Sequence, residues 1–368
     1  MNADRNLTID KQNYIYNIDN IKKIIGTKVE LMAIVKANAY GHGAIEISKL
    51  ANTLGIYYFG VATFDEAYKL RTSDIKGEIL VLGHCNFDEY KKASLNNISV
   101  TVSDINSLEE VSKLDNKIQV HIKIDTGLSR NGFYMHKDGD IDNIVCLIQK
   151  ISENSLIELK GLYTHFASSD SNEEFTLEQL RLFKLLIERL RKKNIKYGLA
   201  HCANSAAIIK YKDSHLDMVR PGLLTYGISP CENKLFVPKP IASLTGTIIQ
   251  INDLEVGDYI GYSGTYFVKS KMRIAVVNLG YADGIPRKLS NKGFLLVNGF
   301  NARIVGRISM DVLTIDITNV KAQIYDKVIF FGESNSVYQS VSYFSNLLNT
   351  IEYEIFCNLG ERIKRTYK

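Results

Sequence analysis

Cysteine is scarce in this sequence, with five residues among 368, an odd number and no CxxC spacing. The scarcity argues against a disulfide framework and a zinc site, so we expect a reducing compartment and no metal. No apolar run approaches the ~18 residues of a membrane span, and the polar N-terminus lacks a signal-peptide core. Neither charge predominates, because 45 Lys and Arg stand against 40 Asp and Glu. We therefore expect a cytoplasmic protein with no membrane or nucleic-acid partner.

Short apolar runs alternate with longer amphipathic segments from about residue 30 to residue 230. Eight runs are typical of strands: Leu31–Val35, Tyr57–Ala62, Ile79–Leu82, Ile98–Val102, Val120–Ile124, Leu159–Thr164, Tyr197–Cys202 and Leu216–Val219. Helical patterns between them include Ala44–Leu54, Asp65–Leu70, Ser107–Leu114 and Thr176–Lys192. Eight strands separated by helices predict a (β/α)8 barrel. A doubly wound open sheet is the alternative, because a strand count cannot show closure.

The C-terminal third has a different pattern. Residues 240–332 contain short strands with Gly, Asn and Asp turns and little helical periodicity. We therefore predict a barrel over residues 1–236 and a mostly-β domain over residues 237–368. Within the second domain we expect a helix at Ser340–Leu348 and a final strand around Tyr353–Cys357. The basic stretch at residues 361–365 is interpreted as a solvated chain end.

Lys36 directly follows the first apolar run, which places it at the C-terminal mouth of the predicted barrel, where barrel enzymes build their active sites. Surroundings of low dielectric lower the pKa of a lysine and make its amine nucleophilic, which suits a covalent bond to an aldehyde cofactor. The alternative is a lysine that snorkels from a strand end. The glycine-rich turn beside Lys36 favours the cofactor interpretation.

The segment around Lys36 resembles the cofactor-lysine signature of the alanine racemases, and it reads Val35-Lys36-Ala37-Asn38-Ala39-Tyr40-Gly41-His42-Gly43. Further matches follow in the same order along nearly the whole chain. The resemblance implies an isomerase that carries pyridoxal 5'-phosphate on Lys36 and interconverts L- and D-alanine, supplying D-alanine for peptidoglycan. It also implies a homodimer in which β-domain residues reach the active site of the partner. A racemase of another amino acid such as serine, or a related decarboxylase, remains the alternative.

The resemblance also assigns contacts with the cofactor. Tyr40 contacts its phosphate, Tyr353 lies near the phosphate or the entrance, and His165 orients a neighbouring arginine and the catalytic tyrosine. Ser205, after Asn204 at a helix start, and Gly222 suit a phosphate cradle, although Asn204 and Ser205 also form a good N-cap. Arg220 would face the pyridine nitrogen. Because a guanidinium can only donate, it disfavours protonation of that nitrogen and weakens the electron sink, whereas the decarboxylases are expected to place an acid there.

Substrate contacts come from both domains in this resemblance. Arg130 binds the substrate carboxylate, which suits a planar bidentate donor. Tyr281 stands at the entrance, and Met310 and Asp311 stand at the edge of the pocket. Lys123 corresponds to a lysine that is often carbamylated in the family, and an ordinary strand lysine paired with Asp125 is the alternative.

Tyr262 matches the second base of the racemases. A tyrosine in a strand is ordinarily a packing residue. Inversion of a stereocentre, however, needs acid and base groups on opposite faces of a planar carbanion, and Lys36 serves only one face. A tyrosine of ordinary pKa near 10 must be polarised to act as a base, and His165 and Arg220 are the candidates.

The chain departs from the family pattern near the pocket. It has no Trp, whereas the family opening usually contains one. Ile285 stands where a tyrosine is expected, and Val312 where a glutamine is frequent. These departures leave the proton-transfer residues in place and put the substrate preference in question.

Overall fold

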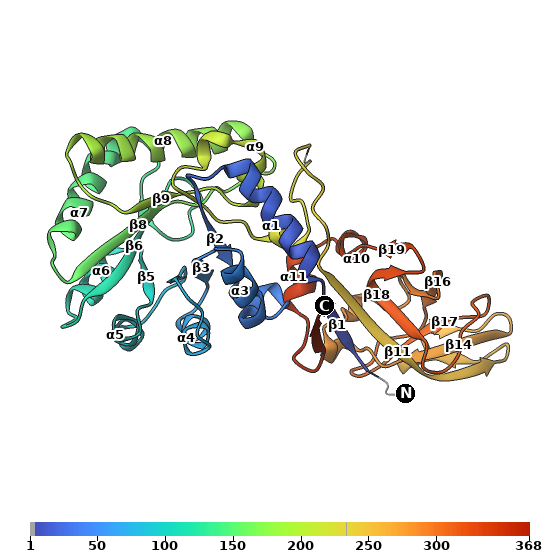
Figure 1. Cartoon of the computed structure of the whole chain (residues 1–368). Coiled ribbons are helices and arrows are strands. Elements are labelled where there is room, and N and C mark those ends of the chain that lie inside the picture. Colours follow the sequence, from blue (N-terminus) through green and yellow to red (C-terminus); the bar gives the residue numbers. More distant parts are fainter. Residues whose placement is uncertain (1–3, 233) are drawn as a thin grey trace. The chain divides into compact units, whose positions relative to one another are not determined.

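The computed structural model describes residues 4–232 and 234–368, which form two compact units (Figure 1). The first unit comprises Asn13–Ala39 and Ala44–Lys239. The second comprises residues 4–12, Tyr40–Gly43 and Pro240–Lys368. The short segment Tyr40–Gly43 thus belongs with the C-terminal unit, although it stands early in the sequence.

The first unit is a closed parallel barrel, and all eight predicted strands are confirmed. They are β2 (Glu30–Ile34), β3 (Tyr58–Val61), β4 (Glu78–Val81), β5 (Ser99–Val102), β6 (Ile118–Asp125), β8 (Ile157–Tyr163), β9 (Leu199–His201) and β10 (Met218–Val219). Their order in the sheet is β5-β4-β3-β2-β10-β9-β8-β6, and β5 also pairs with β6. That pairing, with Val100 opposite Val120, closes the ring and excludes the open sheet. A short strand, β7 (Phe133–Tyr134), continues beside the end of β6.

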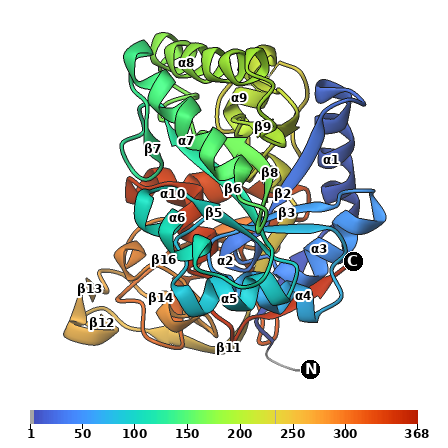
Figure 2. The same ribbon diagram turned by 90° about the vertical axis from the view of Figure 1, so that its left-hand side faces the viewer.

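Helices surround the strands of the barrel (Figure 2). They are α1 (Lys11–Ile25), α3 (Ala44–Thr53), α4 (Phe64–Thr72), α5 (Phe87–Leu95), α6 (Ile105–Ser112), α7 (Ile141–Glu153), α8 (Glu173–Lys192) and α9 (Ser205–Lys210). Local sequence fixes where they begin, because α4, α5 and α6 each start with a capping box, such as Thr63 with Glu66. Each such cap stabilises its helix by about 1 kcal/mol. The boundaries of the barrel helices are therefore encoded locally.

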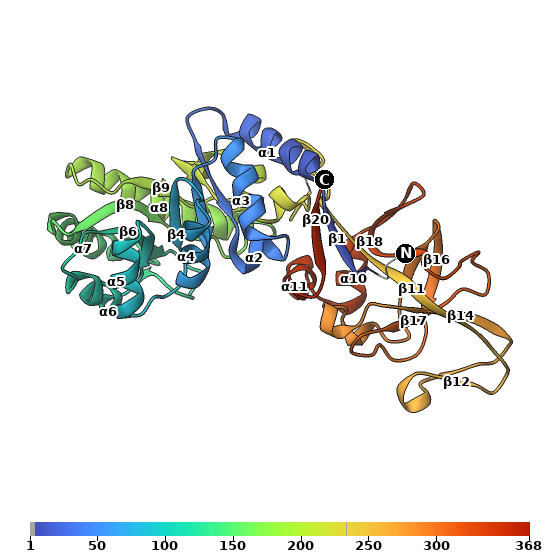
Figure 3. The ribbon, with the colours of Figure 1, turned by 60° about the horizontal axis from the view of Figure 1, so that its bottom comes forward.

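The second unit is built around a nine-stranded sheet in the order β19-β18-β15-β16-β17-β14-β11-β1-β20. Its strands are β1 (Asn6–Ile9), β11 (Ala242–Leu254), β14 (Met272–Val277), β15 (Phe294–Val297), β16 (Phe300–Ile304), β17 (Leu313–Asp316), β18 (Lys327–Ser334), β19 (Val337–Gln339) and β20 (Lys364–Tyr367). Strand β1 lies antiparallel to β11 and parallel to β20, so the first and the last strand of the chain lie side by side (Figure 3). A separate hairpin joins β12 (Tyr259–Ile260) to β13 (Tyr266–Phe267).

The structure corrects two expectations for the C-terminus. The predicted helix is present as α10 (Val341–Leu348), but the predicted strand at Tyr353–Cys357 is wrong, because the segment forms α11 (Glu352–Cys357). A short apolar run does not distinguish a strand from a buried helix. The basic stretch is not a solvated end, because Ile363 is buried and Arg365 donates to the carbonyl oxygen of Gly41 at 2.8 Å. None of the described helices is long and apolar enough to cross a membrane.

Candidate active site

Lys36 stands at the end of β2 and begins α2 (Lys36–Tyr40), a turn of unusual hand. Ala37, Asn38, Ala39 and Tyr40 have φ values of 51°, 53°, 53° and 52°, which lie in the left-handed region. The left-handed conformation costs each non-glycine residue about 1–2 kcal/mol of conformational free energy, so contacts with surrounding residues must offset this cost. Glu66 on α4 supplies some of them, because its carboxylate accepts hydrogen bonds from the N–H groups of Ala37 at 2.6 Å and Ala62 at 2.7 Å. The turn is held in a fixed, strained conformation beside the lysine.

Four cationic residues, which we call the cation cluster, gather at the C-terminal mouth of the barrel: Lys36, Lys123, Arg130 and Arg220. Burial lowers the pKa of Lys123 to about 7, and the charges of Arg130 and Arg220 add to the effect. Burial also holds the pKa of His165 well below its ordinary value, and the charges of all four cations lower it further. Because these positive charges repel one another, the binding of an anionic ligand at this mouth is favourable.

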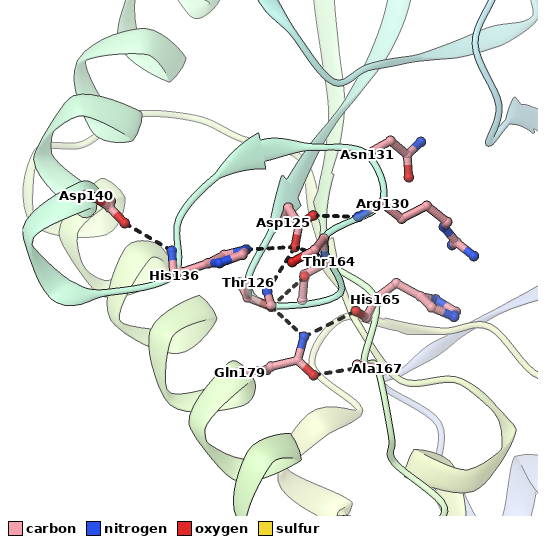
Figure 4. Close-up of polar contacts among 12 residues, drawn as sticks. Asp125, Thr126, Arg130, Asn131, His136, Asp140, Thr164, His165, Ala167 and Gln179 are labelled. Atoms are coloured by element: carbon pink, nitrogen blue, oxygen red, sulfur yellow. Dashed lines mark hydrogen bonds and ion pairs between the residues drawn. The ribbon is translucent and has the colours of Figure 1, made fainter.

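Asp125 organises the loop that presents Arg130 (Figure 4). One carboxylate oxygen accepts hydrogen bonds from the N–H groups of Gly127 at 2.9 Å and Ser129 at 3.1 Å, and the other accepts from the N–H of Arg130 at 3.0 Å. The ring of His136 lies 3.2 Å from the same carboxylate. Among the described residues, the Arg130 side chain is exposed and its guanidinium has no hydrogen-bond partner. The loop thus offers a free bidentate donor to a ligand.

The alternative pairing of Lys123 with Asp125 is absent from the described part of the chain. Nζ of Lys123 donates instead to Oδ1 of Asn131, on the loop that Asp125 organises. The same Nζ lies 5.6 Å from the centre of the Tyr163 ring. Lys123 is therefore a buried amine that forms no ion pair among the described residues, although the charge of Asp125 partly opposes the lowering of its pKa.

Gln179 on α8 joins two loops of the mouth (Figure 4). Its side chain is fully buried, and its oxygen accepts from the N–H of Ala167 at 2.9 Å. Its amide nitrogen donates to Oγ1 of Thr126 at 3.2 Å and to the carbonyl oxygen of His165 at 3.4 Å. The loops after β6 and β8 are thereby fixed together, and the side chains of Arg130 and His165 extend to the same side. The sequence analysis missed Gln179, whose signal was a polar residue on the buried face of a predicted helix.

Arg220 lies directly after β10 and is 4% exposed. Its Nη2 donates to the carbonyl oxygen of Thr164 at 2.7 Å and lies 3.3 Å from Nδ1 of His165. Its Nη1 lies 2.6 Å from Nδ1 of His201. These contacts fix the guanidinium in one orientation and link it to His165.

Asn204 and Ser205 follow β9. Asn204 is the N-cap of α9 and accepts from the N–H of Ala207 at 3.0 Å, as the N-cap alternative predicted. The hydroxyl oxygen of Ser205 accepts from the N–H of Gly222 at 2.8 Å. Ser205 and Gly222 are therefore adjacent, although they come from different strand ends.

The second unit brings Tyr40 and Tyr353 together, with ring centres 5.5 Å apart. Burial, and then the neighbouring Tyr353, raises the pKa of Tyr40 well above its ordinary value, so it stays a protonated donor. Gly41 is required beside it, because its φ is +80° and a Cβ there would lie 2.3 Å from the carbonyl oxygen of Phe356.

Tyr281, Met310 and Asp311 also lie together in this unit. The N–H of Tyr281 donates to the carbonyl oxygen of Ser309, and that of Ala282 donates to the carbonyl oxygen of Met310, each at 3.0 Å. Asp311 is held by Arg362 at 2.7 Å. This ion pair gives the basic C-terminal stretch a structural role.

Tyr262 lies on the turn between β12 and β13, and its side chain is 68% exposed. The next residue, Ser263, accepts from Nη1 of Arg307 at 2.9 Å. Within one chain, the candidate residues thus divide between the barrel mouth and separate groups in the second unit.

A (β/α)8 barrel whose strand ends gather lysines and arginines around one mouth defines an enzyme of the barrel class that takes an anionic ligand. Comparison with known proteins makes the class specific. The family model described as alanine racemase, N-terminal domain, matches residues 9–230, and the one for the C-terminal domain matches residues 241–367.

Individual relatives agree over the full length. The alanine racemase of Clostridium kluyveri is 38% identical and the match covers 98% of this chain and 93% of the relative. The alanine racemase of Bacillus anthracis, solved with bound L-Ala-P, has a TM-score of 0.92 at 30% identity, covering 100% of this chain and 96% of that one. That of Bartonella henselae, solved with covalently bound pyridoxal phosphate, has a TM-score of 0.88 at 28% identity and covers both chains completely. The chain belongs to the alanine racemase family, a family of isomerases.

Proposed function

We propose that this chain interconverts L- and D-alanine with pyridoxal 5'-phosphate attached to Lys36, and that Lys36 and Tyr262 carry the proton on opposite faces of the substrate. The observation that carries the proposal is the cation cluster at the barrel mouth, in a chain that matches alanine racemases over nearly all of its length. The bound cofactor would make the Cα proton of the amino acid acidic.

The residues at the mouth fit an anionic cofactor and an amino-acid substrate. The cation cluster offsets the charges of a phosphate and a carboxylate, and Asp125 is already engaged with its own loop. Arg130 binds the substrate carboxylate, for which its exposed guanidinium is free in the described chain. Phosphate contacts fall to Ser205, helped by its N-cap neighbour Asn204, and to Gly222, Tyr40 and Tyr353. One relative is solved with covalently bound pyridoxal phosphate and another with bound L-Ala-P, which agrees with anionic ligands at this mouth.

His165 can prepare Tyr262 for its task. Because the guanidinium of Arg220 only donates, Nδ1 of His165 accepts and the ring proton stays on Nε2. The low pKa of His165 keeps it neutral, so Nε2–H remains a donor. A hydrogen bond from Nε2 to the phenolic oxygen of Tyr262 would favour the phenolate and make it a usable base near neutral pH.

Tyr262 needs a cover to act as this base. Its exposed side chain is accompanied on the hairpin by Tyr259, 66% exposed, and Phe267, 46% exposed. At so open a position, water would compete with the substrate for the hydroxyl group of Tyr262. Clustered exposed aromatic residues are typical of surfaces that bind another protein. A head-to-tail homodimer, in which this hairpin covers the barrel mouth of a second copy, supplies the cover. Tyr281, Met310 and Asp311 then form the entrance and edge of the shared site.

Arg220 favours racemisation over decarboxylation. With the cofactor bound, a permanently protonated donor facing its ring nitrogen would leave that nitrogen unprotonated, which would limit electron withdrawal and favour simple return of the proton to Cα. Serine is the closest alternative substrate, because it differs from alanine by one hydroxyl, and a hydrophobic pocket rejects such an analogue only weakly. Lys123, with its pKa near 7, has a large neutral fraction that can take up CO2, and the resulting carbamate would hold Arg130.

The test is incubation of the purified protein with single-enantiomer alanine and serine in D2O. We expect both enantiomers of alanine to racemise with deuterium entering Cα, and serine to react more slowly. Absence of racemisation with every amino acid tried, in protein that shows the visible band of the bound cofactor, would refute the proposal.

A further inference from the structure

A continuous chain of polar groups crosses the interior of the barrel, from the mouth to the opposite end. Nη1 of Arg220 lies 2.6 Å from Nδ1 of His201, and Nε2 of His201 lies 2.9 Å from Nδ1 of His121. Nε2 of His121 in turn lies 2.5 Å from Oε1 of Glu78. Glu78 is the first residue of β4, so it stands at the N-terminal end of the strands, away from the mouth. Interiors of such barrels are ordinarily filled by branched apolar side chains.

The two ends of this chain fix the position of every proton along it. Arg220 can only donate, so Nδ1 of His201 must accept and its proton must be on Nε2. That N–H then donates to Nδ1 of His121, whose own proton must be on Nε2 and must point to Glu78. An imidazolium at His121 would place a proton on Nδ1 against the N–H of His201, so both histidines are neutral in this arrangement. Burial agrees for His201, because it holds the pKa well below the ordinary value.

Glu78 is ionised, as the acceptor end requires. Burial raises its pKa, whereas the hydrogen bonds from His121 and Ser99 and the charge of Lys160 lower it. Its side chain is 14% exposed, and that of His121 is fully buried. The carboxylate is therefore a permanent acceptor for His121.

Neighbouring residues fix the orientation of the two histidine rings. A Cβ on Gly161 of β8 would lie 2.2 Å from Nδ1 of His121, so the glycine makes room for the bond between the rings. The ring of His201 stacks on Tyr163 with centres 4.9 Å apart and planes inclined by 6°. The guanidinium carbon of Arg220 lies 5.2 Å from the centre of the same ring. Tyr163 thus aligns His201 and Arg220 with each other.

We propose that Glu78 is a positioning residue for the racemase reaction: its carboxylate fixes the tautomers of His121 and His201, and so presents Nδ1 of His201 as the acceptor that holds Arg220. The inference rests on the proposed role of Arg220 beside the cofactor. Without the acceptor at Glu78, the proton of His121 can move to Nδ1, where it opposes the N–H of His201. His201 then loses its single tautomer, and Arg220 loses a fixed partner.

The test compares Glu78→Leu, which removes the acceptor, with Glu78→Gln, which keeps an oxygen of similar size and position. Ring nitrogens of ¹⁵N-labelled histidine in the holoenzyme are observed by NMR, which distinguishes the two neutral tautomers from the imidazolium. We expect Nε2–H at both His121 and His201 in the natural protein and in Glu78→Gln, and a mixture of tautomers in Glu78→Leu. We expect kcat for alanine to fall about tenfold in Glu78→Leu and much less in Glu78→Gln.

Glu46→Gln is the matched control, because Glu46 on α3 is exposed, binds Lys49 at the protein surface and contacts neither histidine. Unchanged tautomers in Glu78→Leu, or an imidazolium at His121 in the natural protein, would overturn the inference. Equal loss of kcat in Glu78→Leu and either Gln variant would also overturn it. Since the tautomers are observed without turnover, a failure of racemase activity itself is distinguishable from a failure of this inference.

Discussion

Nη2 of Arg220 lies 3.3 Å from Nδ1 of His165, and the direction of this contact determines which proton His165 can offer. The donor-only guanidinium leaves the ring proton on Nε2. His165 therefore acts as a donor to a ligand or to a base, and the predictions below depend on this polarity.

Tyr262→Phe should abolish racemisation and preserve one half-reaction. The change removes the proton carrier from one face, while Lys36 still removes and returns the proton on its own face. We expect solvent deuterium to enter Cα of D-alanine only, since by family resemblance Tyr262 serves the L enantiomer. NMR of each enantiomer separately measures the exchange, after a normal cofactor spectrum is verified. Equal exchange from both enantiomers would show that Tyr262 is not the second base.

Lys36→Ala should abolish racemisation in both directions, because it removes the cofactor attachment and one proton carrier together. In the natural protein, borohydride reduction should fix the cofactor to the peptide that contains Lys36, as peptide mapping by mass spectrometry would report. Lys123 is the informative comparison, because its pKa of about 7 also makes it nucleophilic. Label on the Lys123 peptide would contradict the assignment.

Arg220→Glu should raise transamination relative to racemisation. A carboxylate at this position would accept a hydrogen bond from the protonated ring nitrogen of the cofactor and so favour its protonation. A protonated ring withdraws electrons more strongly. The measurement is the ratio of pyruvate formed to alanine racemised. An unchanged ratio in folded, cofactor-loaded protein would count against the role proposed for Arg220.

Gln179→Leu should destabilise the protein and weaken catalysis. It leaves the N–H of Ala167 without its buried acceptor, at a cost of about 1–3 kcal/mol of unfolding free energy, and removes the amide donor from Thr126, whose hydroxyl keeps its contact with Thr164. We expect kcat/KM for alanine to fall as the Arg130 and His165 loops separate. Urea unfolding and steady-state kinetics measure the two effects, and Gln149→Leu, on the exposed side of α7, is the control. Equal stability of the two variants would show that the buried bridge contributes little.

Lys123 should make stability rise with pH. Its folded pKa is about 7 against an ordinary value of 10.5, so between these values the folded protein binds fewer protons than the unfolded chain, and stability increases as pH rises. Lys123→Met should therefore remove this rise, and its benefit should be greatest below about pH 7. Urea unfolding across this range in carbonate-free buffer measures the effect, with the exposed Lys49→Met as control. A natural protein without the rise under these conditions would contradict a buried free amine at Lys123.

Most of the barrel could be predicted because its signals are local. Each strand is a compact apolar run, and the helix starts carry their own caps, as at Thr63 and Asn204. The placement of Lys36 after β2 follows from chain order alone, because the residue after a parallel strand must stand at the C-terminal mouth. Local signals gave the wrong secondary structure for Tyr353–Cys357, because its helical state depends on the packing of Ile355 and Phe356 in the second unit.

The sequence by itself determined the strand count, the family and the chemical groups available. Only the tertiary structure decided how those groups are held. Glu78 stands 43 residues from His121 in the sequence, and Gln179 stands 53 residues from Thr126. No local sequence pattern predicts either contact. The same is true of β1, whose four residues gain partners in β11 and β20 near the other end of the chain. Hydrogen bonds and proton positions depend on distances of a few ångströms between such remote residues, and these distances exist only once the barrel has closed.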